Sequence, residues 1–354
     1  MNTKLYASEI THFSPQRQLS SKPSQTLPLI KVEALKMYFP FGNMFLGRAK
    51  GTIHAVDGVD FEIPIRRSLA LVGESGCGKT TTGKLLTRLY DPTDGHIYLR
   101  SENNKMVDLA TLKGNELKRF RRRVQMIFQD PYESLNPRLT IFDTIAEPLL
   151  VQGLKTLPER EEIVASLLEQ VDLTPASSFL FRFPHELSGG QRQRVAIARA
   201  LVVSPDFVVA DEPTSMLDVS IRSEVINLML ELADKFGVSY LYITHDLAVA
   251  RYTSQELAVM YLGKIVERGG TEEVLAHPLH PYTRALISAV PIPDPTLQRE
   301  PPAIKGGVSK PVNPKPQCRF LDRCPVATKF CAEADHPPLE DKGSGHFTAC
   351  YMVK

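Results

Sequence analysis

Short, nearly unbroken apolar runs recur along the chain. Four of them have the composition of strands that are buried on both faces of a parallel sheet. They span residues 69–72, 124–128, 207–210 and 240–243. A shorter run at 96–99 follows the turn-forming segment 91–95 and predicts one further strand.

Between these runs the polar and apolar positions have a helical pattern. The helical stretches span residues 79–89, 159–171, 191–203 and 219–236. Alternation of strand and helix is typical of an α/β fold. We therefore predict an α/β domain whose sheet is built from the four longer apolar runs.

Both ends of the chain break this pattern. Residues 1–28 are polar, rich in Ser and Gln and without a period, which predicts a mobile tail. Residues 291–316 contain eight of the 27 prolines, which exclude a long helix and predict an extended connector. We expect a main domain at 29–290 and a small cysteine-containing module at 317–354.

Composition indicates a globular protein of ordinary charge. The chain has 354 residues, is 43% hydrophobic and 23% charged, and carries a formal net charge of +2. These values exclude wholesale disorder and provide no basic field for nucleic acid. No apolar run approaches the roughly 20 residues that cross a bilayer. The N-terminus lacks the apolar core of a signal peptide, so the expected compartment is the cytoplasm.

A glycine-rich segment after the run at 69–72 has the spacing of a phosphate-binding loop. Residues 73–80 read GESGCGKT, which fits G-x-x-x-x-G-K-S/T between a strand and a helix. Glycines let backbone N–H groups approach phosphate oxygens, and a helix N-terminus favours the same anion. Lys79 is expected to neutralise the β- and γ-phosphates, and the Thr80 hydroxyl to ligate Mg²⁺. The predicted nucleotide contacts are Gly73, Ser75, Gly76, Cys77, Gly78, Lys79, Thr80 and Thr81.

Two acids and a histidine follow other predicted strands. Asp211 and Glu212 end the run at 207–210, and His245 follows the run at 240–243. A carboxylate at a strand end can hold Mg²⁺, and a second can accept a proton from the attacking water. We assign Asp211 to the metal and Glu212 to the catalytic base. The position of His245 after a strand favours a role in the same site.

A third motif indicates the family. Residues 187–194 read LSGGQRQR, and with the loop and the acidic pair they resemble the signature of ABC-type ATPases. The resemblance runs from about residue 29 to 290. It implies a RecA-like P-loop NTPase core with an antiparallel β subdomain and a helical subdomain at about 130–205. Further matches are Gln129 in the glutamine loop, Asp218 in the D-loop, the switch histidine His245, and Tyr38 as the adenine-stacking aromatic, with Phe39 as the competing choice.

The family resemblance implies a two-chain ATP site. The γ-phosphate held by one subunit would contact the signature motif of an opposing ATPase subunit, identical or related. Gln129 would sense this phosphate and share Mg²⁺ binding with Thr80 and Asp211. Met216 departs from the alanine that is usual in the family's D-loop. The signature residues expected to contact ATP are Ser188, Gly189, Gly190 and Gln191.

A narrower resemblance covers other segments. QDPYESLNPR at 129–138, HPYT at 280–283 and the C-terminal cysteines are similar to ATPase subunits of oligopeptide, dipeptide and nickel importers. This resemblance implies ATP hydrolysis that powers peptide import, with nickel or glutathione as alternative solutes. The partners would be a second ATPase, two membrane permeases contacted through residues 130–153, and a periplasmic or extracellular solute-binding protein. The subunit would lie at the cytoplasmic face of a bacterial inner membrane.

Four of the five cysteines lie near the C-terminus, at Cys318, Cys324, Cys331 and Cys350. Clustered cysteines in a cytosolic protein indicate a metal more often than disulfides. Four thiolates are enough for a 4Fe–4S cluster or a zinc site, and free thiols are the alternative. Some peptide-importer ATPases carry such a cluster in this tail, so the resemblance favours iron–sulfur. The nearby histidines at 336 and 346 are interpreted as ordinary polar residues.

Two other functions are less well supported by the sequence. An ABC ATPase that acts on nucleic acid, in repair or translation, usually has an interrupted or a duplicated core, whereas this core is single. The basic run at 118–123 is interpreted as a solvated helix face rather than a nucleic-acid site. A regulatory protein that only binds ATP is disfavoured by Glu212 and His245. We therefore expect an ATP- and Mg²⁺-dependent transport ATPase without a nucleic-acid partner.

Overall fold

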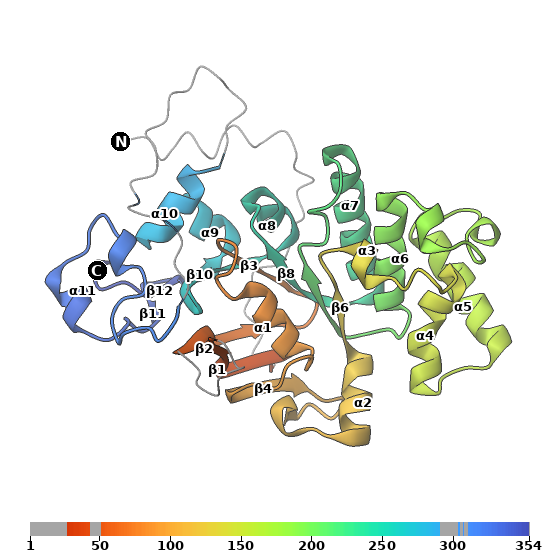
Figure 1. Cartoon of the computed structure of the whole chain (residues 1–354), viewed down its shortest axis with the longest axis horizontal. Helices are drawn as coiled ribbons and strands as arrows, with labels where there is room; N and C mark the ends of the chain where they lie inside the picture. The colour runs from red at the N-terminus through yellow and green to blue at the C-terminus, as the bar shows by residue number, and fades with distance from the viewer. Residues whose placement is uncertain (1–26, 43–50, 291–303, 305–306, 308–310, 354) are drawn as a thin grey trace, which may run out of the picture.

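The computed structural model describes residues 27–42, 51–290, 304, 307 and 311–353 (Figure 1). Most of the predicted tail at 1–28 and of the predicted connector at 291–316 lies outside these residues. The described strands are β1 (Ile30–Phe41), β2 (Gly51–Ile63), β3 (Ser68–Val72), β4 (Asp94–Arg100), β5 (Met106–Asp108), β6 (Val124–Ile127), β7 (Phe207–Asp211), β8 (Ser239–Thr244), β9 (Glu256–Tyr261), β10 (Lys264–Gly270), β11 (Glu340–Asp341) and β12 (Phe347–Thr348). The described α-helices are α1 (Lys79–Leu86), α2 (Gly114–Arg123), α3 (Pro131–Ser134), α4 (Ile141–Gln152), α5 (Leu157–Gln170), α6 (Gly189–Leu201), α7 (Val219–Phe236), α8 (Leu247–Thr253), α9 (Thr271–Ala276), α10 (Pro281–Ser288) and α11 (Lys329–Glu333).

A parallel sheet forms the centre of the molecule, with strand order β9-β3-β8-β7-β6. Every residue of β7 and β8 is buried, as expected for strands covered on both faces. Alternate residues of these strands face different cores. Val209 and Ile243 pack in the core that contains α1, whereas Val208 and Tyr242 pack in the core that contains α6 and α7. The predicted α/β alternation is confirmed.

A second, antiparallel sheet packs against α1. Its strand order is β2-β1-β4-β5. Leu85 and Leu86 of α1 are fully buried in one core with apolar residues of both sheets. Figure 1 shows α1 between this smaller sheet and the parallel one. The antiparallel β subdomain expected from the family resemblance is therefore present.

Helices α3 to α6 form a separate layer beyond β6 (Figure 1). Thr156 and Glu159 form a capping box at the start of α5, and Thr140 caps α4. Apolar residues of α4, α5 and α6 share one core, which continues onto the sheet through β7 and β8. None of the described helices combines the length and apolar character needed to cross a bilayer.

Residues 311–353, called the C-terminal segment below, pack on the far edge of the large sheet. Its strand β12 pairs antiparallel with β10, and β11 pairs with β12. Phe320 is buried against Tyr261 of β9 and Tyr282 of α10, with ring centroids 5.2 and 5.5 Å away. The sheet thus runs from β6 beside the helical layer to β11 at the opposite edge.

Candidate functional site

The phosphate-binding loop joins β3 to α1 and lies between two other strands. Gly73 and Gly78 have positive φ angles of 154° and 116°. A Cβ at Gly73 would lie 2.2 Å from the carbonyl oxygen of Met260, and one at Gly78 would lie 2.1 Å from that of Ala55. Only glycine fits at either position. The close packing of β9 and β2 on the loop therefore requires the same glycines as phosphate binding.

Lys79 begins α1 and folds back over this loop. Its Nζ donates to the carbonyl oxygens of Gly73 at 2.7 Å and Glu74 at 3.0 Å. The side chain is buried, so the charge is held inside the loop where a phosphate would sit. The Cys77 thiol in the same loop is also buried, and burial raises its pKa. The other predicted contacts, Ser75, Gly76 and Thr81, lie in the loop or the first turn of α1.

Thr80 and Asp211 meet where α1 faces the end of β7. Thr80 Oγ1 donates to Asp211 Oδ1 at 3.1 Å. Asp211 is 3% exposed, and this burial raises the pKa of its carboxyl to about 6, although the Thr80 hydrogen bond acts in the opposite direction. A hydroxyl and a carboxylate are hard oxygen ligands of the kind that Mg²⁺ prefers. The donor set at this position therefore fits Mg²⁺.

Glu212 contacts the other two residues predicted to act in catalysis, Gln129 and His245. His245 Nδ1 lies 3.1 Å from Glu212 Oε1, and Gln129 Nε2 donates to Oε2 at 3.2 Å. Glu212 has a φ of 44°, which is unusual for a non-glycine residue, and its N–H donates to the carbonyl oxygen of Ile243 at 2.8 Å. Residues from the ends of β6, β7 and β8 thus converge at one edge of the sheet.

The signature motif begins α6, away from α1. Ser188 Oγ accepts from the N–H of Gln191, and Gln191 Oε1 accepts from the N–H of Ser188 at 3.0 Å, which makes a capping box. Leu217 of the D-loop packs beside Gly189, and Asp218 is the N-cap of α7. In Figure 1, α6 and α1 lie on opposite sides of β6. The signature motif therefore does not close over this chain's own phosphate loop.

The predicted adenine-stacking residue, Tyr38, lies on β1 beside β2. The His54 ring stacks on it with centroids 3.9 Å apart, and the Tyr38 hydroxyl donates to Asp57 Oδ1 at 2.5 Å. The competing residue, Phe39, instead makes an edge contact with Tyr90. Sequence reasoning missed His54 and Asp57. His54 and Asp57 lie three positions apart, which would place them on opposite faces of a regular strand. A register shift between the pairs Met37–Val56 and Tyr38–His54 brings both beside Tyr38, so the sequence pattern offered no signal.

The four C-terminal cysteines line one small cavity of about 10 Å³, which has room for about one water molecule. Burial raises the pKa of the Cys318 thiol to about 11. All four are free thiols, and the described residues contain no group of three or more His, Cys, Asp or Glu side chains that could hold a metal ion as they stand. A thiol donor set in one cavity fits a metal by its chemistry but not by its present arrangement. His336 and His346 make ordinary polar contacts, with the Arg319 N–H and the Glu267 carboxylate.

The fold and the phosphate-loop geometry define a P-loop ATPase, and comparison with known proteins specifies the class. A family model described as "ABC transporter" matches residues 56–215, and one described as "Oligopeptide/dipeptide transporter, C-terminal region" matches residues 266–331. The solved dimeric ATP-binding cassette MJ0796, bound to ADP and Pi, is similar with a TM-score of 0.59 and 28% identity, over 68% of this chain and 98% of that one. CbiO1 of Clostridium perfringens is similar with a TM-score of 0.58 and 26% identity, over 71% and 91%.

Curated relatives match over nearly their whole length. The oligopeptide transport ATP-binding protein AppF of Bacillus subtilis is 45% identical, over 92% of this chain and 97% of the relative. The dipeptide transport ATP-binding protein DppF of Haemophilus influenzae is 43% identical, over 95% and 100%. The chain belongs to this family of ABC transporter ATP-binding proteins, and it is an ABC-type ATPase. The match favours the predicted transport ATPase over the alternative that acts on nucleic acid.

Proposed function

We propose that this ATPase powers the import of short peptides. The observation that supports ATP hydrolysis is the position of Glu212, which lies between Gln129 and His245 and beside the Thr80–Asp211 pair. The peptide part is supported by the relatives, which are named as oligopeptide and dipeptide transport ATP-binding proteins. Nickel and glutathione are the alternative solutes. The proposed divisions are an ATPase domain at 29–290, a connector at 291–316 and a C-terminal module at 317–354.

In the proposed mechanism, Lys79 and the loop N–H groups bind the phosphates, while Thr80, Asp211 and Gln129 hold Mg²⁺. When bound, Mg²⁺ neutralises charge on the β- and γ-phosphates. Glu212 accepts a proton from the attacking water, and His245 fixes the orientation of its carboxylate. Each Glu212 oxygen has one protein partner and keeps a second lone pair, so the carboxylate can accept from water without losing Gln129 or His245.

The proposed active form is a dimer, because Ser188, Gly190 and the rest of the signature motif face away from this chain's own loop. The dimeric ATP-binding cassette MJ0796 supports this arrangement. The second ATPase is a copy or a relative of this chain. Across the interface, ATP makes contacts through its γ-phosphate that ADP cannot make. This difference in contacts drives closure of the dimer with ATP and its opening with ADP.

Proposed contacts with a membrane permease lie on residues 130–153 of the helical layer. Tyr132, Leu150 and Val151 expose 58, 62 and 58% of their surface in this range. Large apolar side chains left exposed in this range are available to contact another protein. We propose that the subunit lies at the cytoplasmic face of a bacterial inner membrane, bound to two permeases and, through them, working with a solute-binding protein; its relatives, named as transport ATP-binding proteins, support this proposal.

The test compares Glu212→Gln with Lys79→Met. Glu212→Gln should lower steady-state ATP turnover by about 10²- to 10⁴-fold while ATP binding remains, because glutamine cannot accept the proton. Lys79→Met should lose ATP binding itself. Near-normal turnover in Glu212→Gln would contradict the assignment of the base. For the solute, reconstitution with the permeases should give ATP-dependent uptake of dipeptides; uptake of nickel or glutathione alone would reject peptides.

We also propose that Cys318, Cys324, Cys331 and Cys350 bind a 4Fe–4S cluster, with a rearrangement of the thiols. The shared cavity and the family resemblance support this proposal. Anaerobically purified protein should contain iron and acid-labile sulfide and absorb as a brown chromophore. Cys331→Ser should lose both, whereas Cys77→Ser, a matched change at a buried thiol outside the cavity, should not. Zinc without sulfide, or no metal, would reject the cluster.

A further inference from the structure

Two arginines of the C-terminal segment reach carboxylates beside the proposed nucleotide site. Arg319 and Arg323 lie four positions apart, between Cys318 and Cys324, and their side chains are only 8 and 9% exposed. Each pairs with an acid far away in sequence. Buried arginines held by single carboxylates fix the position of both partners, because either charge left alone would be costly.

Arg323 holds the phosphate loop. It makes a two-pronged ion pair with Glu74, with Nη1–Oε2 at 2.7 Å and Nη2–Oε1 at 2.9 Å. The Glu74 backbone is equally constrained: its N–H donates to the Tyr282 hydroxyl at 2.9 Å, and its carbonyl oxygen accepts from Lys79 Nζ. Arg323 therefore anchors the residue whose carbonyl oxygen positions the phosphate-binding lysine.

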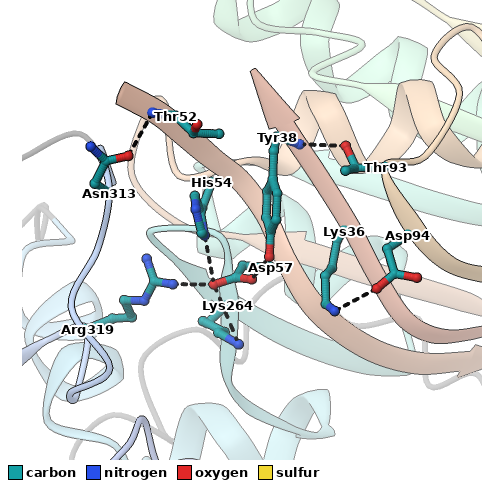
Figure 2. A network of polar contacts seen from close by, with 10 residues as sticks. All are labelled: Lys36, Tyr38, Thr52, His54, Asp57, Thr93, Asp94, Lys264, Asn313 and Arg319. Atoms are coloured by element: carbon teal, nitrogen blue, oxygen red, sulfur yellow. Dashed lines mark hydrogen bonds and ion pairs between the residues drawn. The ribbon is translucent and has the colours of Figure 1, made fainter. Parts of the chain in front are cut away.

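Arg319 holds the tyrosine proposed to stack on adenine. Figure 2 shows Asp57 at the centre of a polar network, with Tyr38, His54, Lys264 and Arg319 pointing toward it. Oδ1 accepts from the Tyr38 hydroxyl, while Oδ2 pairs with Arg319 and lies 3.5 Å from His54 Nδ1 and 3.8 Å from Lys264 Nζ. Because Arg319 occupies Oδ2, the other oxygen stays directed at Tyr38.

The C-terminal segment also binds the strand that carries this network. The Thr52 N–H donates to Asn313 Oδ1 at 2.8 Å, and the Asn313 N–H donates to the Thr52 carbonyl oxygen at 2.9 Å (Figure 2). The His54 N–H donates to the carbonyl oxygen of Pro311 at 3.0 Å. A short stretch of the segment thus pairs with β2 next to the ring that covers one face of Tyr38.

We propose that Arg319 and Arg323 are positioning residues of the nucleotide site, Arg319 acting through Asp57 on the Tyr38 ring and Arg323 acting through Glu74 on the phosphate loop. The C-terminal segment thereby sets the affinity for ATP without touching it. This inference rests on the proposed function, because it assumes that adenine stacks on Tyr38 and that the phosphates lie in the loop.

The experiment measures dissociation constants of the full chain for ATP and for inorganic tripolyphosphate, without Mg²⁺ so that no hydrolysis occurs. Arg319→Met should weaken ATP binding about tenfold, because the ring on which adenine stacks loses the contact that fixes its position. It should leave tripolyphosphate binding unchanged, because that probe has no base. Arg323→Met should weaken both probes about tenfold. Arg251→Met removes a comparable two-pronged pair with the exposed Glu272 and should change neither.

Conservative and double variants separate positioning from loss of folding. Arg319→Lys should recover most of the ATP affinity, since one charged contact satisfies Asp57, whereas Arg323→Lys should not, since lysine cannot bind Glu74 through two prongs. In an Asp57→Asn background, Arg319→Met should have no further effect. Additive effects there, equal losses for both probes in Arg319→Met, or no loss in either methionine variant would overturn the proposal. Unchanged ATP binding by Lys79→Met would instead overturn the nucleotide site.

Discussion

Two regions of the molecule achieve precise positions by different means. The proposed catalytic edge consists of the phosphate loop, Gln129, Asp211, Glu212 and His245, which lie at the ends of neighbouring parallel strands. The C-terminal segment instead reaches the site through ion pairs between residues more than 240 positions apart. The first region is built by the direction of the sheet, and the second by long-range contacts. Changes at Glu212 and His245 in the first region should alter rates, and changes in the second region should alter affinity and stability.

The largest expected effect belongs to the catalytic edge. His245→Ala should lower ATP turnover about 10³-fold, because it leaves Glu212 without the partner that orients its carboxylate. ATP affinity and the unfolding midpoint should change little. Steady-state kinetics and equilibrium binding measure the difference, with the exposed His185→Ala as the control. Turnover within tenfold of the parent protein would contradict a catalytic role for His245.

Loss of a residue that holds the C-terminal segment should instead lower stability and leave turnover unchanged. Glu267 of β10 is fully buried and accepts from the N–H groups of Leu279 and His280 and from His346 Nε2 at 2.7–2.8 Å. Glu267→Ala should lower the free energy of unfolding by about 3 kcal/mol, since buried donors lose their acceptor. The folded fraction should keep its turnover. Denaturant unfolding measures the loss, and Glu272→Ala, at an exposed acid, should cost no more than about 0.5 kcal/mol.

Asp211 should show that the catalytic edge is built at the expense of stability. Its pKa is raised by burial from 3.8 to about 6, so the charged form is penalised in the folded protein. The stability present below pH 4 is lost as the pH rises through about 6. Asp211→Asn should therefore raise the free energy of unfolding at pH 8 by about 2 kcal/mol, after loss of part of the Thr80 hydrogen bond. Equal or lower stability of the variant at pH 8 would contradict this account.

The same pKa predicts a smaller effect on metal binding. Protonation of Asp211 below about pH 6 removes the charge that holds Mg²⁺. The Mg²⁺-dependent part of ATP affinity should therefore fall about tenfold between pH 7 and pH 5, at one proton per site. Titrations with and without Mg²⁺ at each pH measure it. A fall of the same size in Asp211→Asn would assign the pH dependence to another group.

The sequence by itself determined most of the α/β core. The runs at 207–210 and 240–243 predict strands because a strand covered on both faces must be apolar throughout, and β7 and β8 confirm it. The catalytic edge was also predictable, since residues that follow parallel strands share one edge of the sheet. Lys79, Asp211 and Glu212 could therefore be placed together before any distance was known.

Only the tertiary structure decided how the C-terminal segment is attached. Arg319, Arg323 and Glu267 have no spacing that marks them, and their partners Asp57, Glu74 and His346 belong to other elements. Periodicity describes which face of an element is buried, but it does not identify which distant carboxylate an arginine will meet. That pairing follows from the folded arrangement, which packs β9 and β2 on the phosphate loop and pairs β12 of the C-terminal segment with β10. The residues proposed to bind and hydrolyse ATP could thus be read from local motifs. The residues proposed to position its binding site could be identified only from contacts that exist after folding.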